Sequence, residues 1–509
     1  MKIFGTDGIR GKYGSFPITK EDIFYLGQSL VEVLRIKDDA IFFIISNDGR
    51  ESGIFLQDAL SSGIRKVGGE VTLVGINPTP IVGYATKCIN EMLIVEHCPT
   101  VGPKMISCFG VQITASHNPF SDNGIKIFNS NGQKISAELE SKIEACFSKL
   151  KNLDQPKYVR KFRSPEMKST GEVMGLEHPW NEIFDNAMSP SRMYKNMLLH
   201  IFDNELNISS QEKKIKIMID CANGAYSPYI ESMFNLFPNY IVVPIYNKPN
   251  GVNINLSCGA TKPEVLKEEL IQYNKSNKDQ VDFGASYDGD GDRVIFITKK
   301  GNIVNGDQIL FIFSKYLKEV ENYNGAVVGT SMTNFGIQKA YDEIGINLIK
   351  TDVGDKYVLE KMKEIHSIIG GESSGHIIFN HLDYYLYTEE AIHGKEDPYP
   401  IGDSLLTTLY LLKIMNYYKN NISLDDMIES IPITPSRLFN QKVINKTEFL
   451  SDKHNKKVFA TLVNEIEGNG RILIRPSGTE NLIRVLIEHR DVNKIDELEM
   501  YFYDNIKQK

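Results

Sequence analysis

The fold of this chain is most constrained by an alternation of strand-like and helix-like patterns that recurs along its length. Ala40 to Ile45 is a continuous apolar run, which is typical of a strand buried on both faces of a sheet. Apolar residues recur at helical spacing before this run, from Asp22 to Leu34, and after it, from Ile54 to Val67. A strand pattern at Val71 to Val74 continues the series, and Pro78-Thr79-Pro80 is expected to stop it. Alternation of this kind predicts an α/β domain.

The same order of elements returns twice before it changes, which implies internal duplication. The second round contains the strand Ile215 to Asp220, and the third begins at about Ile303. From about Thr434 the order becomes β-α-β-β-α, which predicts a smaller α+β domain. We therefore predict three similar α/β domains with mixed sheets over residues 1–172, 173–302 and 303–432, followed by an α+β domain over residues 433–509.

Bulk composition excludes several classes of protein. The chain has 509 residues, of which 41% are hydrophobic and 24% charged, and its net charge is -8. This charge, with basic and acidic residues interspersed, argues against a surface that coats nucleic acid. The six cysteines contain no C-x-x-C pair, as expected of reduced cytosolic thiols, and the apolar runs are only strand-length. We expect a cytoplasmic protein without a signal peptide, a membrane span or a nucleic-acid partner.

A serine lies on a predicted loop at the end of a strand. Thr114-Ala115-Ser116-His117-Asn118-Pro119 follows the apolar run Phe109 to Ile113. Pro119 cannot continue a strand ladder and biases Asn118 toward an extended backbone, so we expect Ser116 on a sharp turn. Ligands of α/β sheets bind at such strand ends. Taken alone, the stretch also fits an ordinary turn.

Three aspartates alternate with glycines in Asp288-Gly289-Asp290-Gly291-Asp292-Arg293. The glycines permit backbone angles that turn three carboxylates inward, and like charges this close favour a bound cation. A calcium-hand loop is excluded, because its sixth and twelfth positions would be Arg293 and Lys299 instead of Gly and Glu. The loop predicts a Mg²⁺ site with open positions, one of which a phosphate on Ser116 could fill. An exposed acidic turn is the alternative.

Two more polar loops complete the set. Gly371 to His376 offers the Glu372 carboxylate and the Ser374 hydroxyl, and Arg475 to Glu480 offers a guanidinium, hydroxyls and main-chain N–H groups. The second of these loops predicts an anion site, although a polar hairpin would use the same residues. A Walker loop is not present, because Thr6 stands where its first glycine should be, so ATP is not the expected phosphoryl donor.

The serine loop, the carboxylate cluster and the two polar loops, in this order along the whole chain, resemble the α-D-phosphohexomutase superfamily. The opening Phe4-Gly5-Thr6-Asp7-Gly8-Ile9-Arg10-Gly11 is most similar to its bacterial phosphoglucosamine mutase branch. The resemblance implies domains around a central cleft, small sugar phosphates as ligands, and an isomerase whose phosphoserine exchanges phosphate between C1 and C6 of a hexose. It also implies Mg²⁺ as cofactor and a hexose 1,6-bisphosphate as intermediate and activator, and it leaves a homodimer open.

The resemblance assigns roles to individual residues. Catalytic roles fall to Ser116, Arg10, His117, Lys126, Arg293 and His376, and metal binding falls to Ser116, Asp288, Asp290 and Asp292. Sugar binding falls to Glu372 and Ser374, and binding of the non-reacting phosphate falls to Arg475, Ser477, Gly478, Thr479 and Arg484. Lys126 follows Asn123-Gly124, a dipeptide that predicts a turn before its strand. The candidates for proton transfer are Lys126, Arg10 and His376. We favour Lys126, since nearby cations would lower its pKa, although a solvated strand lysine has the same local pattern.

The signals for the preferred sugar conflict. Phosphoglucosamine mutases typically carry Gln where this chain has Ser373, whereas the opening turn and Thr351 to Asp355 favour that branch. We predict interconversion of glucosamine 6-phosphate and glucosamine 1-phosphate for cell-wall precursors, with phosphomannomutase/phosphoglucomutase as the alternative. A catalytically silent sugar-phosphate scaffold would be expected to lose Ser116 or a loop aspartate, and a metal-dependent phosphatase would release inorganic phosphate.

Two stretches look inserted relative to the family pattern, Glu96 to Phe109 and His381 to Pro400. Both border the predicted cleft. Surface excursions are their simplest interpretation.

Overall fold

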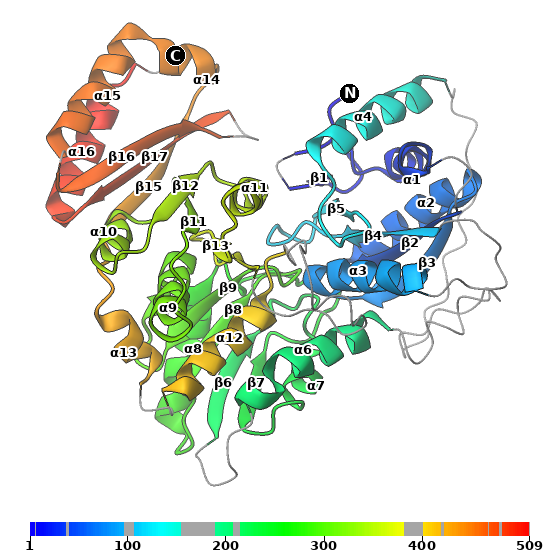
Figure 1. The fold of residues 1–509 in the computed structure, drawn as a ribbon. Coiled ribbons are helices and arrows are strands. Elements are labelled where there is room, and N and C mark those ends of the chain that lie inside the picture. Colours follow the sequence, from blue (N-terminus) through cyan, green and yellow to red (C-terminus); the bar gives the residue numbers. More distant parts are fainter. Residues whose placement is uncertain are drawn as a thin grey trace.

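The computed structural model describes residues 1–5, 7–36, 40–95, 106–153, 189–206, 214–380, 401–418, 422–466, 468–477 and 481–507. These residues form three α/β units and a smaller α+β unit, each built on its own sheet (Figure 1). The first unit, in blue and cyan, lies at one side of the molecule in Figure 1, and the C-terminal unit, in orange and red, lies at the other. The predicted fold class is confirmed.

The first unit has the sheet order β1-β5-β4-β2-β3. Its strands are β1 (Ile9–Lys12), β2 (Ala40–Asn47), β3 (Glu70–Ile76), β4 (Ile106–Ile113) and β5 (Asp122–Phe128), and its helices are α1 (Lys20–Leu34), α2 (Glu51–Lys66), α3 (Thr79–Val95) and α4 (Ala137–Leu153). Strand β2 runs parallel to β3 and β4, whereas β5 returns antiparallel to β4. Side chains of β2 alternate between two hydrophobic cores, which explains its continuous apolar run.

The second unit repeats this topology in the order β10-β9-β8-β6-β7. Its elements are α6 (Pro190–Leu206), β6 (Ile215–Asp220), α7 (Ile230–Phe234), β7 (Tyr240–Ile245), α8 (Pro263–Ser276), β8 (Phe283–Tyr287), β9 (Val294–Thr298) and β10 (Ile303–Val304). Strand β6 coincides with the predicted run.

The third unit has the order β12-β11-β13-β14. Its elements are α9 (Gly306–Val320), β11 (Val327–Thr330), α10 (Phe335–Glu343), β12 (Leu348–Thr351), α11 (Asp355–Ile365), β13 (Ile369–Gly371), β14 (Ile377–Phe379), α12 (Ser404–Tyr417) and α13 (Leu424–Glu429). The C-terminal unit has the order β15-β17-β16. Its elements are β15 (Ser436–Lys442), α14 (Lys446–Ser451), α15 (Lys453–Ile466), β16 (Gly470–Pro476), β17 (Leu482–His489) and α16 (Val492–Asn505).

Strands β4, β8 and β13 hold the same place in the first three sheets. Each is parallel to one neighbour and antiparallel to the strand that follows it in the chain. The serine loop (Thr114 to Pro119), the acidic loop (Asp288 to Arg293) and the sugar loop (around Gly371 to His376) each connect this strand to its antiparallel successor. The three loops are topological equivalents, which supports the duplication inferred from element order.

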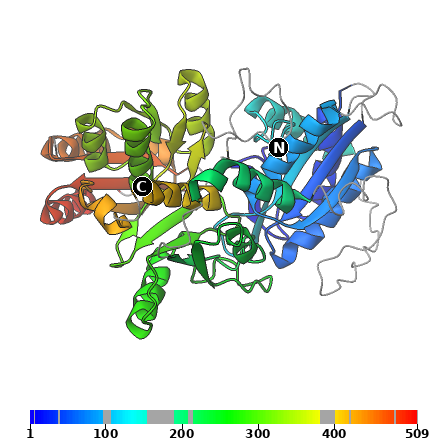
Figure 2. The ribbon, with the colours of Figure 1, turned by 60° about the horizontal axis from the view of Figure 1, so that its bottom comes forward.

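One hydrophobic core runs through the first three units. Helix α6 lies between α3 and α12 (Figures 1 and 2), and the rings of Tyr84 and Tyr194 meet edge-on with centroids 6.3 Å apart. Leu409 of α12 belongs to the same cluster. The C-terminal unit has a separate core that includes Phe439 and Phe502.

The C-terminal unit is attached to the third unit by polar contacts. Arg471 donates to the carbonyls of Ser331 (2.8 Å) and Thr333 (2.6 Å). Asn334 Nδ2 donates to Glu488 Oε1 at 3.0 Å. These contacts join the end of β11 and the start of α10 to the sheet of the C-terminal unit.

Two local predictions were wrong. We expected Pro78-Thr79-Pro80 only to stop a strand, but Thr79 and Pro80 open α3, since Pro is tolerated in a first helical turn. We also expected Asn123-Gly124 to form a turn, but both residues lie in β5 and pair with β1. A Cβ at Gly124 would come within 2.3 Å of the Ile9 carbonyl oxygen, so this glycine permits close strand packing.

Several predictions fall outside the described residues. They are the 172/173 boundary, all of the stretch 381–400, and residues 96–105 of the other inserted stretch. The end of that stretch, Ile106 to Phe109, lies in β4 and is therefore part of the sheet. Within the described ranges, no helix combines the length and the apolar composition needed to cross a membrane.

Candidate functional site

Ser116 is fully buried at the turn between β4 and β5 and has a left-handed backbone with φ of +53°. Its main-chain N–H donates to Thr114 Oγ1 at 2.8 Å, which stabilises the turn. Its hydroxyl donates to Asp288 Oδ2 of the acidic loop at 2.6 Å and lies 3.2 Å from His117 Nδ1. The fold therefore brings the predicted serine and a predicted metal ligand into direct contact.

Side chains to which the sequence analysis gave no role hold the serine loop. The Arg50 guanidinium is fully buried, pairs with Asp48 at 2.8 Å, and donates to loop carbonyls that include Ser116 O and Asn118 O, each at 2.9 Å. Asn255 of the second unit donates to the same two carbonyls. An Asp-Gly-Arg turn at the end of a strand was the available signal for Arg50, whereas nothing local singles out Asn255.

The acidic loop is tied to all three α/β units through consecutive carbonyls. Gly289 O accepts from Ala225 N (2.8 Å), Asp290 O from Thr79 N (2.8 Å), and Gly291 O from Ser404 N (3.1 Å). These contacts orient Asp288, Asp290 and Asp292, which are buried and each offer an oxygen within 4.8 Å of the others. The three predicted metal ligands therefore form one cluster.

The charges of this cluster are strongly coupled. Burial raises the pKa of Asp288 well above its usual range, and the neighbouring Asp292 and Asp290 add to this effect. Lys126 Nζ lies 2.8 Å from Asp290 Oδ2 and 2.7 Å from Asp292 Oδ2. Burial alone would lower the pKa of Lys126, but Asp290, Asp292 and Asp7 outweigh it and hold this pKa well above its usual range.

The expectation that cations around Lys126 lower its pKa was therefore wrong for this state. Lys126 lies on β5, as predicted, but its ammonium points into the carboxylates of another unit. A contact between segments 164 residues apart cannot be read from local sequence.

The residues of the cluster fit a divalent cation. Asp290 Oδ1 and Asp292 Oδ1 are buried and have no hydrogen-bond partner in the described part of the protein. Carboxylate oxygens are the ligands that Mg²⁺ prefers. Buried polar atoms without partners cost free energy, and a bound cation would give these two oxygens a partner.

Basic side chains surround the serine and the acidic loop. Burial, together with the positive charges of Arg293 and Arg10, lowers the pKa of His117 to about 4, so its ring is neutral near pH 7. Arg10 pairs with Asp7 and donates to Ala115 O at 3.4 Å. Arg293 Nε lies 3.7 Å from Asp292 Oδ1.

His376 and a second set of charges lie beside the cluster. His376 Nδ1 is 3.8 Å from Asp292 Oδ1, and its Nε2 accepts from Gly402 N at 3.1 Å, which places the ring proton on Nδ1. Lys134 pairs with both Asp7 and Asp355 and so joins the first unit to the third. Sequence reasoning gave no role to Lys134 or Asp355.

The sugar loop is held by hydrogen bonds from main-chain N–H groups of neighbouring segments. Glu372 Oε1 accepts from Gly354 N at 3.0 Å, which connects this loop to the start of α11. Ser374 Oγ is buried without a hydrogen-bond partner among the described residues. The anchoring contact at Ser373 is made by its carbonyl, which accepts from Gly306 N at 3.0 Å.

Two arginines face each other at the predicted anion loop. Arg475 of β16 and Arg484 of β17 are directly opposite in the antiparallel register. Burial lowers the pKa of Arg475, and the charge of Arg484 lowers it further. Like charges opposite each other are destabilising, so an anion between them would be favourable. Ser477 is buried nearby, whereas Gly478 and Thr479 lie outside the described residues.

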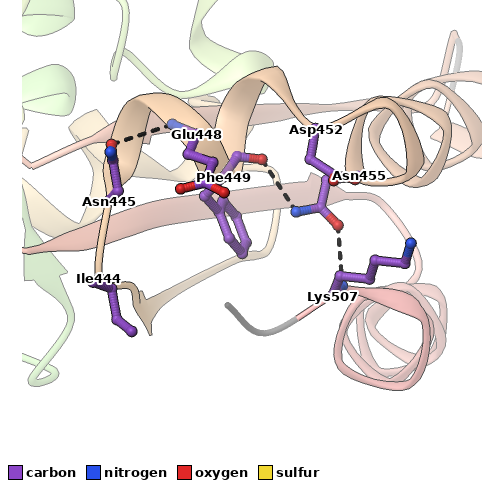
Figure 3. Close-up of a pocket in the computed structure, with 7 residues that line it drawn as sticks. All are labelled: Ile444, Asn445, Glu448, Phe449, Asp452, Asn455 and Lys507. Carbon is purple, nitrogen blue, oxygen red and sulfur yellow. Dashed lines mark hydrogen bonds between the residues drawn. The ribbon is translucent and has the colours of Figure 1, made fainter.

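The pocket drawn in Figure 3 is a different feature of the C-terminal unit. It is lined by Ile444, Asn445, Glu448, Phe449, Asp452, Asn455 and Lys507. Several of its polar groups are paired within the unit: Asn455 donates to Phe449 O (3.1 Å) and accepts from Lys507 N (3.0 Å). It contains none of the predicted site residues and is not the candidate active site.

Models of the phosphoglucomutase/phosphomannomutase family match the chain in four successive segments. The alpha/beta/alpha domain I matches residues 1–154, domain II residues 193–301, domain III residues 305–433, and the C-terminal domain residues 438–505. Among solved structures, a family protein from Burkholderia thailandensis has a TM-score of 0.71 at 20% identity and covers 99% of this chain and 96% of its own. That likeness supports the fold.

Curated relatives agree with the family models. A phosphoglucosamine mutase of Marinomonas sp. is 34% identical over 505 residues, which are 99% of this chain and 97% of the relative. A phosphoglucosamine mutase of Desulforamulus reducens is 35% identical over 98% of this chain and 97% of its own length. The chain therefore belongs to the phosphoglucomutase/phosphomannomutase family, in the α-D-phosphohexomutase superfamily, with similarity to bacterial phosphoglucosamine mutases.

Proposed function

We propose that this protein interconverts glucosamine 6-phosphate and glucosamine 1-phosphate through a phosphoserine at Ser116. The observation that carries the proposal is the 2.6 Å contact between the Ser116 hydroxyl and Asp288. It places a nucleophile against the carboxylate cluster, where a cation can neutralise a transferring phosphoryl group. The curated phosphoglucosamine mutases that resemble the whole chain support this assignment.

The reaction consists of two phosphoryl transfers. In the first, the bond between phosphorus and Ser116 Oγ breaks while a bond to the C1 hydroxyl oxygen of glucosamine 6-phosphate forms, and that hydroxyl loses its proton. The product is the 1,6-bisphosphate. After the bisphosphate turns around, its C6 phosphoryl group passes to Ser116 Oγ, the C6 oxygen gains a proton, and glucosamine 1-phosphate is released. A hexose 1,6-bisphosphate also phosphorylates a resting Ser116 and so acts as activator.

We assign proton transfer at Ser116 to His117 and charge compensation to Lys126. The neutral ring of His117 is 3.2 Å from the hydroxyl, and a phosphate beside it would raise its low pKa toward the working range. The ammonium of Lys126 is held by carboxylates, which supports an electrostatic role. Arg10, Arg293 and His376 complete the charged shell.

Mg²⁺ is the cofactor that we propose for the acidic loop. Asp288, Asp290 and Asp292 would hold it together with an oxygen of the Ser116 phosphate. When bound, it neutralises charge on the transferring group. A structural neighbour, N-acetylphosphoglucosamine mutase from Aspergillus fumigatus, is described in complex with GlcNAc-6P and magnesium; it has a TM-score of 0.60 at 16% identity and covers 94% of this chain and 84% of its own.

The remaining site residues bind the substrate. Glu372 and Ser374 would bracket the vicinal hydroxyls of the sugar. Ser373 stands where phosphoglucosamine mutases typically carry Gln, but its anchoring contact is made by the main-chain carbonyl, so the loop stays anchored. The phosphate that does not react would lie at the anion loop, bound by Arg475, Ser477, Gly478, Thr479 and Arg484. In this proposal, domain 1–172 carries the phosphoserine, domain 173–302 the metal loop, domain 303–432 the sugar loop and domain 433–509 the anion loop. We propose that the enzyme is cytoplasmic and supplies cell-wall precursors.

Isomerisation assays on four sugar phosphates test the proposal. Glucosamine, N-acetylglucosamine, glucose and mannose 6-phosphates should be compared with their matching bisphosphates present. We expect the highest kcat/KM with glucosamine 6-phosphate and weak turnover of glucose 6-phosphate. Equal or better turnover of mannose 6-phosphate would favour a phosphomannomutase/phosphoglucomutase, and release of inorganic phosphate would indicate a phosphatase.

A further inference from the structure

Two side chains from different units hold the same two carbonyls of the serine loop. Arg50 Nη2 donates to Ser116 O and Asn118 O at 2.9 Å each. Asn255 Nδ2 donates to the same oxygens at 2.8 Å and 3.2 Å. We propose that Asn255 is a positioning residue that fixes the Ser116 hydroxyl against the acidic loop, an inference that rests on the proposed function.

The backbone of Asn255 is itself held in an uncommon conformation. Its φ is +56°, and its N–H donates to Ala222 O at 2.9 Å, where Ala222 also has a positive φ of +52°. Asn tolerates this left-handed region better than most residues, and such conformations persist only where the surroundings over-determine them. The second unit therefore holds Asn255 in the conformation that directs its amide group at the serine loop.

Ser116 needs this support because it is also left-handed. A non-glycine residue with φ of +53° is under strain, and nothing within its own turn except the Thr114 hydroxyl contacts its N–H in the described structure. Its carbonyl accepts hydrogen bonds from both Arg50 and Asn255. Loss of one donor would let this peptide rotate and would move the hydroxyl away from Asp288.

The acidic loop packs directly on this contact. A Cβ on Gly289 would lie 2.7 Å from Asn255 Nδ2 and 2.7 Å from Ser116 O. Only a glycine leaves room for the amide, the serine carbonyl and the acidic loop to meet. Asn255 therefore lies at the contact between the serine loop, which carries the nucleophile, and the acidic loop, which carries the proposed metal ligands.

The bracing is reciprocal between the two units. Thr79 of the first unit donates its hydroxyl to Asp290 Oδ2 at 2.5 Å and its N–H to Asp290 O at 2.8 Å. The first unit thus orients a carboxylate of the second, while Asn255 of the second orients the serine of the first. Removing a group that orients a metal ligand typically lowers metal affinity or activity by about 10- to 100-fold. We expect a loss of similar size when the serine loop loses its support.

Asn255 is a better experimental target than Arg50. Removing the Arg50 guanidinium would leave the buried Asp48 carboxylate without its ion pair, which destabilises the fold. Asn255 is neutral and only half-buried. Its replacement tests geometry with little effect on the core.

Asn255→Gly removes the amide while the backbone keeps a conformation that glycine adopts without strain. Ser257→Gly is the matched control, because Ser257 lies in the same loop with φ of +52° and an exposed side chain. Asn255→Asp is a second test variant that preserves volume but presents an acceptor to the two carbonyls. Full-length proteins should be compared by thermal melting, by amide exchange of the segment Thr114 to Asn118, and by single-turnover phosphorylation of Ser116 from glucose 1,6-bisphosphate with Mg²⁺.

We expect Asn255→Gly to melt close to the wild type and Asn255→Asp to melt at a lower temperature, because its carboxylate repels the two carbonyl oxygens. Both variants should exchange the serine-loop amides faster and phosphorylate Ser116 about 10- to 100-fold more slowly. The KM for glucosamine 6-phosphate should stay within about twofold, since the anion loop is untouched. Ser257→Gly should match the wild type in every respect. Unchanged amide exchange or unchanged phosphorylation in Asn255→Gly would overturn the inference. If the wild type accepts no phosphate, the proposed function fails instead, and amide exchange alone decides the positioning role.

Discussion

Ser116 of the first unit donates a 2.6 Å hydrogen bond to Asp288 of the second, although the two residues are 172 positions apart. The contact exists because their loops occupy equivalent places in two similarly connected sheets. A phosphate on Ser116 Oγ would therefore lie at a carboxylate cluster, which requires compensating positive charge.

Lys126 provides part of that charge, so its removal should strengthen metal binding. In a Lys126→Met variant, Asp290 and Asp292 lose their ammonium partner, and we expect the affinity for Mg²⁺ or Mn²⁺ to rise about tenfold. Calorimetric titration measures this change. Unchanged metal affinity in Lys126→Met would show that the lysine does not influence the metal site.

Asp290→Ala removes a proposed metal ligand, so this variant should lose metal affinity and all activity. Chelation of the metal should likewise abolish the activity of the wild type.

Arg475→Ala should weaken substrate binding more than chemistry. The pair Arg475 and Arg484 carries like charges in cross-strand register, and an anion relieves their repulsion. We expect KM for the sugar phosphate to rise at least about tenfold with a smaller loss of kcat. Inorganic phosphate should raise the melting temperature of the wild type but not of the variant. If kcat/KM is unchanged, Arg475 does not belong to the site.

Gly289→Ala should separate the nucleophile from the acidic loop. The added methyl group would collide with Asn255 Nδ2 and Ser116 O, so we expect turnover to fall by about 10- to 100-fold. Gly75→Ala is the control, because Gly75 has φ of +74° and open space around it. It should cost stability without changing kcat/KM. Equal kinetic losses in the two variants would show that the effect at Gly289 is only destabilisation.

Asp403 should make stability depend on pH. It caps α12 and accepts hydrogen bonds from Tyr194 (2.6 Å) and Tyr226 (3.1 Å), and burial raises its pKa to about 6. The folded chain thus binds this proton more tightly than the unfolded chain, whose Asp pKa is about 3.9. The resulting stabilisation is complete below about pH 4 and is lost as the pH rises through 6.

Asp403→Asn removes this titration. From about pH 5 to pH 7.5 the wild type should lose about 1 kcal/mol of unfolding free energy relative to the variant, as measured by urea denaturation. Tyr194→Phe is a useful companion, since it removes one hydrogen bond but leaves the carboxyl group. Parallel pH profiles for wild type and Asp403→Asn would contradict the shifted pKa.

The sequence predicted those parts of the fold that have a strong local pattern. The apolar run at Ala40 was found as β2 and Ile215 to Asp220 as β6, because strands buried on both faces are continuous in hydrophobicity. Helix α3 was missed, since Pro78 and Pro80 read locally as a stop although Pro is also compatible with a helix start.

The sequence predicted the reactive and metal-binding groups of the candidate site, but not the side chains that hold them in place. Asp288, Asp290 and Asp292 were expected together because they share one short loop, and the fold adds Ser116 to them. The environment of Lys126 and the contact of Asn255 depend on the packing of one unit against another, which no local pattern encodes. The predicted roles of Gly478 and Thr479 stay predictions.

Phosphorylation of Ser116 is the most direct test of the proposed mechanism. Wild type and Ser116→Ala should be incubated with glucose 1,6-bisphosphate and Mg²⁺, analysed by intact mass, and then given glucosamine 6-phosphate. We predict that the wild type gains one phosphate and passes it to the sugar, whereas Ser116→Ala gains none and loses at least about 10³-fold in turnover. Full turnover by Ser116→Ala with bisphosphate supplied would contradict it.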